Sequence, residues 1–341
     1  MIRTQVDGNG TAQETPTMPK IESATPLPTD HIVHADWSVN PKRRWLVRIE
    51  RRENSWHVHA PELVGDLSTL LHRIASQANG RKSLLGLDLP IGAPRFWAEK
   101  AGVEEFLPFL KGLGFPPWEN FYNPASTIAE IGPRRPFYPA RPGGRKQAHL
   151  VQGLDANSMD DLCRRVDFNA EGKRAATPMF WTLGAAQVGK AALSFWREVL
   201  QPGLVGSAAP AVWPYNGALK LLISQNPMTI CETYPAEVYE WFGLTVSLSN
   251  KAKTRQQHRA EDADLLLDAG TSLGARFRPE AQMVIKDGFP MGDDAFDAMV
   301  GALGMLQVVQ GKRAPGTPDD PKVHAIEGWI LGRRAGATGT F

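Results

Sequence analysis

Near the end of its first quarter the chain reads Ser83-Leu84-Leu85-Gly86-Leu87-Asp88-Leu89-Pro90-Ile91-Gly92, a nearly continuous apolar run that carries one charge, Asp88. Continuous apolar runs of this length are typical of a strand that is buried on both faces, as in a parallel sheet. A buried carboxylate must be paired, metal-bound or protonated, because its desolvation is costly. The run therefore predicts a central parallel strand that ends on a carboxylate in need of a partner.

The segments before this strand predict the opening of a mixed sheet. Residues 31–35 lead into Asp36, a polar turn follows at 40–42, and residues 44–49 and 55–60 have the composition and alternation of strands. Residues 66–78 predict a helix, with Asp66 as its N-cap and leucines at helical spacing. Three antiparallel strands, a helix and a buried parallel strand are the opening of an RNase H-like fold.

The remaining chain completes an α/β fold with a five-stranded mixed sheet flanked by helices. The fifth strand is expected at 229–233, and helices at 183–200, 235–242, 250–269 and 293–310. Residues 93–182 are rich in Pro and Arg and predict a long insertion with little regular structure. We expect the domain to span 31–332, between a disordered tail at 1–30 and a flexible tail at 333–341.

The composition narrows the function classes. A net charge of +2 over 341 residues does not indicate a nucleic-acid binder by bulk charge, so such binding would depend on local patches. The two cysteines, Cys163 and Cys231, form no Cys-x-x-Cys pair, which argues against a disulfide scaffold and a cysteine-rich zinc site. No apolar run reaches the ~20 residues that a membrane span needs. We expect a soluble, cytoplasmic protein without a membrane partner; its oligomeric state is left open.

Carboxylates end several predicted elements. Asp36 and Asp88 close strands, Glu232 lies in a strand, and Asp294 and Asp297 share one side of the last helix. Gathered in one place, these groups would repel one another unless a cation joined them, and Mg²⁺ or Mn²⁺ is the natural choice for oxygen ligands. Each carboxylate taken singly has a structural explanation as a cap or an ion-pair partner. The prediction of a metal site depends on the whole set.

Several short motifs occur in order along the chain: Ala35-Asp36-Trp37, Gly86-Leu87-Asp88-Leu89-Pro90-Ile91-Gly92, Glu232-Thr233-Tyr234-Pro235, Asp293-Asp294-Ala295-Phe296-Asp297-Ala298 and Glu327-Gly328-Trp329-Ile330. Together they resemble the motifs of domain-of-unknown-function family 429, whose members are described as predicted RNase H-like nucleases. The resemblance covers about residues 32 to 332. It implies a catalytic set of Asp36, Asp88, Glu232, Asp294 and Asp297.

The last helix is also similar to that of Holliday-junction resolvases of the same superfamily, in which paired helical aspartates bind metal. The long insertion and the nearly neutral charge of this chain are departures from those resolvases, so junction resolution does not follow. The metal ligands that the two resemblances imply are Asp36, Asp88, Asp294 and Asp297.

Two basic segments are candidate substrate-binding regions. The first combines positive side chains with aromatic residues and prolines, a combination that can follow a nucleic-acid backbone and stack bases; it comprises Arg134, Arg135, Arg141, Arg145 and Lys146. The second lies at the start of a predicted helix and comprises Lys251, Lys253 and Arg255. Both segments are equally compatible with solvated surfaces whose charges pair locally.

Three functions are compatible with these features. The first is a divalent-metal-dependent nuclease or phosphodiesterase, with Glu232 as a further ligand or as the group that orients the attacking water. The second is an ATP-dependent enzyme of the actin and sugar-kinase architecture, which would need a glycine-rich turn that Asp36-Trp37-Ser38 lacks. The third is a non-catalytic binding protein in which the acidic cluster is structural.

Overall fold

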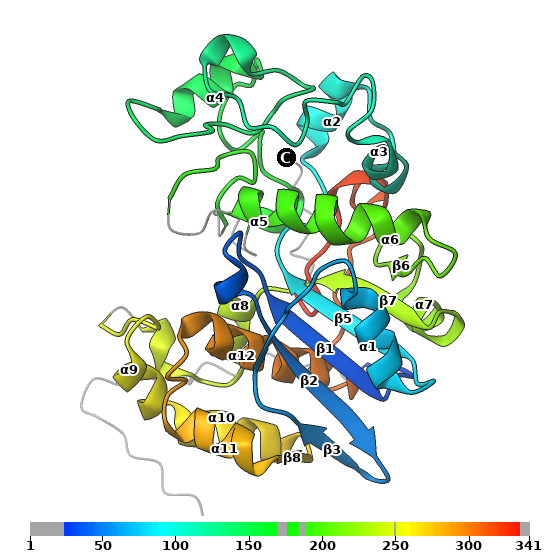
Figure 1. The fold of residues 1–341 in the computed structure, drawn as a ribbon, viewed down its shortest axis with the longest axis vertical. Coiled ribbons are helices and arrows are strands. Elements are labelled where there is room, and N and C mark those ends of the chain that lie inside the picture. Colours follow the sequence, from blue (N-terminus) through cyan, green and yellow to red (C-terminus); the bar gives the residue numbers. More distant parts are fainter. Residues whose placement is uncertain (1–23, 169–175, 185–187, 249, 335–341) are drawn as a thin grey trace, which may run out of the picture.

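The computed structural model describes residues 24–168, 176–184, 188–248 and 250–334. Within them, eight strands form one sheet in the order β6-β7-β5-β1-β2-β3-β8, with β4 paired to β2 (Figure 1). The strands are β1 (His31–Asp36), β2 (Trp45–Arg52), β3 (Ser55–Val58), β4 (Glu62–Leu63), β5 (Ser83–Asp88), β6 (Ala211–Val212), β7 (Met228–Glu232) and β8 (Ala275–Phe277).

The sheet is mixed, as the sequence predicts. Strands β1, β2 and β3 pair antiparallel in succession, whereas β5 runs parallel to β1 and β7 runs parallel to β5. Flanking helices make the protein an α/β fold. The sheet has eight strands where the sequence predicts five, because β4, β6 and β8 contain only two or three residues each, too few to show an alternating pattern.

Twelve α-helices and six short 3-10 or π segments connect and cover these strands in the described part of the chain. The α-helices are α1 (Leu70–Ala78), α2 (Arg95–Ala101), α3 (Phe106–Gly112), α4 (Gln147–Gly153), α5 (Val188–Phe195), α6 (Gln201–Val205), α7 (Leu219–Gln225), α8 (Pro235–Trp241), α9 (Gln256–Glu261), α10 (Ala263–Ser272), α11 (Pro279–Lys286) and α12 (Asp293–Val309). The short segments are η1 (Pro41–Arg43), η2 (Ile128–Glu130), η3 (Arg165–Asp167), η4 (Trp196–Leu200), η5 (Thr245–Ser247) and η6 (Val323–Glu327).

Several helix predictions differ from the structure in their ends or their continuity. The helix predicted over 183–200 is described from Val188, as α5, and it continues through η4 and α6 to Val205. The helix predicted from Asp66 begins at Leu70, because the Asp66 carboxylate accepts hydrogen bonds from Ser68 and holds a turn before the helix. The helix predicted over 250–269 is two helices, α9 and α10, which meet at Asp262. The carboxylate of Asp262 accepts hydrogen bonds from the Thr245 hydroxyl and the Val246 N–H.

Alternation along the strands divides the core into two layers. Val33, Leu85 and Ile230 point to one face, where α1, α5 and the segment 93–182 cover them. Ile32 and Leu84 point to the other face, which α12 covers together with α8, α10 and α11. Figure 1 shows α1 and α12 on opposite sides of the strands.

Helix α12 is buried around nearly its whole circumference, which is typical of a helix at the centre of a domain. It lies close against β1, where the ring of His34 packs on Gly301. A Cβ at Gly301 would stand 2.2 Å from that ring, so only glycine permits this approach. The ring of His34 is further held by the Ala298 carbonyl at 3.1 Å and the Thr233 hydroxyl at 2.8 Å.

The described part of the segment 93–182 contains only short helices, turns and loops, but its aromatic residues form a core. The ring of Trp97 has Phe109, Phe121 and Phe180 within 5.3–5.7 Å of its centroid. Phe137 continues this cluster. The cluster is continuous with the core that covers one face of the sheet, so the described part of this segment is packed onto the domain.

The ends of the described chain are also packed, although the sequence predicts tails there. The N–H groups of Ala24 and Leu27 donate to the Gly311 and Val309 carbonyls, and Leu27 is buried. Arg333 is buried and forms an ion pair with Glu237 at 2.5 Å. Residues 1–23 and 335–341 of the two predicted tails lie outside the described residues. None of the helices in the described ranges has the length and apolar character that crossing a bilayer requires.

Candidate acidic site

Asp36 and Asp88 stand side by side at the edge of the sheet. They are the last residues of the parallel strands β1 and β5, and they are paired directly in the register. Side chains alternate between the two faces of the sheet along a strand. Ile32 and Leu84 face α12, and Asp36 and Asp88 are each four residues further along the same strands, so both carboxyls point toward that helix. The carboxyl ends of parallel strands are where open α/β sheets bind ligands.

Helix α12 adds Asp297, which is 3% exposed. Burial, followed by the negative charges of Asp297 and Asp88, raises the pKa of Asp36 well above its usual value. Burial and then the charge of Asp297 raise the pKa of Asp88 to about 7. Burial also raises the pKa of Asp297, against the opposing effect of Lys253. The three carboxyls therefore share one site in which negative charge is poorly compensated.

Lys253 and Tyr239 are the direct partners of Asp297. The Lys253 ammonium donates to Oδ2 of Asp297, and the Tyr239 hydroxyl donates to Oδ1. The sequence predicts Lys253 as part of a substrate-binding basic segment, but the structure places its ammonium within the acidic site. Sequence reasoning missed Tyr239, because nothing in the composition of α8 distinguishes this tyrosine from a core residue.

Asp294 lies at the rim of the site. Its two carboxylate oxygens accept hydrogen bonds from Nε and Nη2 of Arg43 at 2.6 and 2.7 Å. Arg43 belongs to η1, which follows β1, and it also stands 3.7 Å from Asp293. The charge of Asp294 contributes to the raised pKa of Asp36, after burial and the charges of Asp297 and Asp88. The structure thus brings Asp294 near the three carboxyls but pairs it with a cation of its own.

Glu232 lies on the opposite face of the sheet from the aspartates. In the register it is paired with Leu87, whose side chain points away from α12, so the alternation of the strand turns Glu232 the same way. Its carboxylate accepts hydrogen bonds from Arg164 Nη1 and Nη2 at 2.6 and 2.7 Å and from the Ile91 N–H at 2.7 Å. The next residue, Thr233, faces the acidic site instead and holds His34.

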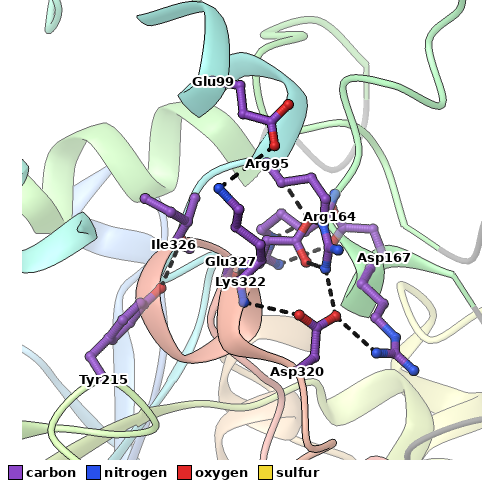
Figure 2. A network of polar contacts seen from close by, with 10 residues as sticks. Arg95, Glu99, Arg164, Asp167, Tyr215, Asp320, Lys322, Ile326 and Glu327 are labelled. Atoms are coloured by element: carbon purple, nitrogen blue, oxygen red, sulfur yellow. Dashed lines mark hydrogen bonds and ion pairs between the residues drawn. The ribbon is translucent and has the colours of Figure 1, made fainter. Parts of the chain in front are cut away.

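A buried network surrounds Arg164, which is 1% exposed (Figure 2). Arg164 also pairs with Asp167 at 2.9 Å. Beside it, Arg95 binds Glu327 at 2.6 Å and Asp320 at 2.8 Å. These contacts connect the segment 93–182 with β7 and with the C-terminal segment around η6. The predicted catalytic Glu232 is therefore part of an ion-pair network.

Contacts from several elements fix the turn after Asp88. The Ile91 N–H donates to Glu232, and the Ile91 carbonyl accepts from the Tyr215 hydroxyl at 2.6 Å. The indole N–H of Trp196 donates to the Pro90 carbonyl at 3.0 Å. After β1, the indole of Trp37 lies 3.4 Å from the Ser194 hydroxyl. The chain leaving each aspartate is thus held by α5, η4 and the network behind the sheet.

The chemistry of the site suits a divalent metal. Asp36, Asp88 and Asp297 offer hard carboxylate oxygens, and their excess negative charge would be relieved by a cation. Within the described ranges, no group of three or more His, Cys, Asp or Glu side chains is already arranged to hold a metal ion. In this structure the Lys253 ammonium, not a ring of carboxylates, faces Asp297.

The other predicted substrate-binding residues have mixed surroundings. Four of them are exposed on the segment 93–182: Arg134, Arg141, Arg145 and Lys146. Arg135 donates to the Asn123 carbonyl at 2.8 Å and pairs with Glu130 at 3.3 Å, so it has a structural role. Lys251 pairs with Glu261 at 2.6 Å, whereas Arg255 is exposed at the start of α9.

Comparison of the chain with protein-family models, with curated proteins and with solved structures yields no match. The geometry and electrostatics of this site are therefore the observations from which a function can be inferred.

Proposed function

We propose that this protein is a divalent-metal-dependent hydrolase of phosphodiester bonds, with nucleic acid as its substrate class. The observation that carries the proposal is the meeting of Asp36, Asp88 and Asp297, whose pKa values are all raised, at one edge of the sheet. Such a concentration of buried like charge is expected at functional sites, where a cation or substrate completes the electrostatics.

The topology supports an RNase H-like architecture as part of the same proposal. The five longest strands have the order β3-β2-β1-β5-β7, with the first three antiparallel and the last two parallel to β1. Aspartates at the ends of β1 and β5, and on α12, fit the resemblance to domain-of-unknown-function family 429. Membership of that family is proposed on the same residues.

Asp36, Asp88 and Asp297 would hold Mg²⁺ or Mn²⁺, and Asp294 would join them if it exchanged Arg43 for the metal. When bound, the ion would stabilise charge on the phosphoryl oxygens and lower the pKa of a bound water. Asp88 must lose its proton before it can act as a ligand, which sets a lower pH limit for binding. Glu232 would act from behind the sheet by holding the turn at Ile91.

The exposed basic residues of the segment 93–182 would bind the backbone of the substrate. Arg134, Arg141, Arg145 and Lys146 are exposed, and a phosphate backbone is recognised by positive charge without regard to sequence. Salt-dependent binding that weakens when these residues are neutralised is the expected behaviour.

The test combines Mn²⁺ titration by calorimetry with cleavage of labelled single- and double-stranded DNA and RNA. Asp36→Asn and Asp88→Asn should each lower the cleavage rate by at least about a hundredfold, the scale on which a single catalytic group acts. Asp268→Asn is the matched control, because this carboxylate is exposed on α10. The proposal fails if both site variants remain folded and cleave at the wild-type rate, or if the wild-type protein binds no metal.

A structural acidic cluster in a non-catalytic binding protein is the second candidate. It is favoured by the contacts of Asp297, whose two oxygens already have Lys253 and Tyr239 as partners. This function predicts binding of nucleic acid without metal and no effect of the aspartate-to-asparagine substitutions on that binding. The same set of variants therefore distinguishes the two candidates.

A further inference from the structure

Lys253 supplies positive charge to the acidic site from a segment with no regular structure before α9. Its ammonium contacts Asp297, and its charge also acts on Asp36 and Asp88. The side chain is 40% exposed, so part of it is in contact with the solvent. A lysine stem is flexible, and it can turn its charge outward without movement of the backbone.

The backbone at Lys253 is fixed. The guanidinium of Arg259, which is buried, donates to the Lys253 carbonyl and also to the carbonyls of Gly288 and Phe289 at 3.0 Å each. Gly288 and Phe289 lie just before α12, the helix that carries Asp297. One buried side chain therefore holds the start of the lysine stem in place relative to the segment that leads into α12. Beyond this anchored carbonyl, the flexible side chain is the part of Lys253 that can move.

The single positive charge of Lys253 cannot neutralise all three carboxylates of the acidic site. A single ammonium faces three carboxyls, and it donates to only one of them. A divalent ion at the same carboxyls would supply twice the charge and would repel the ammonium at contact distance. Occupation of the site by the ion and by the ammonium should therefore be mutually exclusive.

We propose that Lys253 is the resident counter-cation of the acidic site and that its ammonium exchanges with the divalent metal. The inference rests on the proposed function, because it takes Asp36, Asp88 and Asp297 as the metal ligands. In the metal-free protein the ammonium holds the carboxyls together, and metal binding releases it toward the solvent, where it faces an approaching anionic substrate. Binding of the metal thus requires displacement of an internal competitor.

The first test compares Mn²⁺ affinities by calorimetry at constant ionic strength, well above pH 7. Lys253→Met removes the charge and keeps most of the stem, and it should bind Mn²⁺ at least about tenfold more tightly than wild type, which corresponds to about 1.4 kcal/mol. Lys253→Arg keeps the charge and should bind Mn²⁺ more weakly than Lys253→Met. Lys251→Met is the matched control in the same segment, since Lys251 pairs with Glu261 outside the site, and it should behave as wild type.

The second test uses the wild-type protein and does not depend on the folding of a variant. Lysine acetylation is followed by mass spectrometry with and without Mn²⁺. Released from Asp297, Lys253 should react several-fold faster in the presence of the metal, whereas the rate at Lys251 should not change.

The outcomes separate the inference from the proposed function. If wild type binds Mn²⁺ but Lys253→Met binds it no more tightly, or if Mn²⁺ does not accelerate acetylation of Lys253, the counter-cation is refuted and the metal site stands. If wild type binds no Mn²⁺, the inference and the metal-dependent function are refuted together.

Discussion

The substitution Glu232→Gln separates a positioning role for this residue from a role as a metal ligand. Both carboxylate oxygens are used: Oε1 accepts from Arg164, and Oε2 accepts from Arg164 and from the Ile91 N–H. Glutamine has nearly the same shape, but its amide group would place a donor against one of these donors. The change also removes the negative charge that faces a guanidinium with 1% exposure.

The expected loss of stability follows from this burial. Removing one partner of a buried ion pair costs about 3–5 kcal/mol, because an uncompensated charge is left behind. Asp167 remains beside Arg164 at 2.9 Å, so we expect a loss near the lower end, about 3 kcal/mol. The measurement is urea unfolding of the metal-free protein. Glu99→Gln is the control: Glu99 is 62% exposed and 3.6 Å from Lys322, and its loss should cost less than about 1 kcal/mol.

Metal titration of the same variant completes the test. A positioning residue that acts through the turn at Ile91 should leave folded Glu232→Gln able to bind Mn²⁺, whereas Asp88→Asn should not. If Glu232→Gln kept the stability of wild type and lost metal binding, Glu232 would be a ligand and our reasoning from the face of the strand would be wrong.

Two further predictions concern stability. The pKa of Asp88 is raised from 3.8 to about 7, so between these pH values the folded protein binds one more proton than the unfolded protein. The free energy of unfolding of metal-free wild type, measured with urea, should therefore fall as the pH rises from about 4 to 7. Asp88→Asn should lack this contribution to the pH dependence. An unchanged slope would show that Asp88 is not the group that titrates. Gly301→Ala should destabilise the protein by about 1–3 kcal/mol through its contact with His34, despite the better helix propensity of alanine. Gly112→Ala, whose Cβ would have its nearest neighbour at 4.0 Å, should be neutral or stabilising in the same thermal unfolding experiment.

The parts of the fold that the sequence predicts are those with a strong local pattern. Strand β5 is an apolar run that ends on Asp88, and α12 begins at an Asp-rich turn and continues as an apolar helix. Both pack at the centre of the domain, where burial imposes the pattern on the sequence. The short strands β4, β6 and β8 and the division of α9 from α10 depend on distant contacts, and the sequence carries no local signal for them.

The sequence predicts which strands and which helix carry the residues of the candidate site, but not to which face of the sheet each side chain points. Ends of parallel strands meet at one edge of a sheet, so Asp36 and Asp88 could be placed together from the sequence. Glu232 has the same location along its strand, but one step of register decides to which side its carboxylate points. The partners Arg164 and Lys253 are far from these residues in the chain, and single-sequence reasoning has no means to pair them.

Compensation of charge, rather than burial alone, distinguishes the carboxylates of this sheet. Glu50 is as buried as the aspartates, and burial acts to raise its pKa, yet hydrogen bonds from Arg81, His59 and Arg52 bring the pKa down to about 2. Glu232 is likewise surrounded by donors. Asp36 and Asp88 instead have other carboxyls as near neighbours, so their ionised forms are disfavoured until a cation arrives. A fold can hold a compensated carboxylate for its own stability. At Asp36 and Asp88 the charge of Lys253 opposes burial and the neighbouring carboxyls without overcoming them, and the proposed metal site rests on this imbalance.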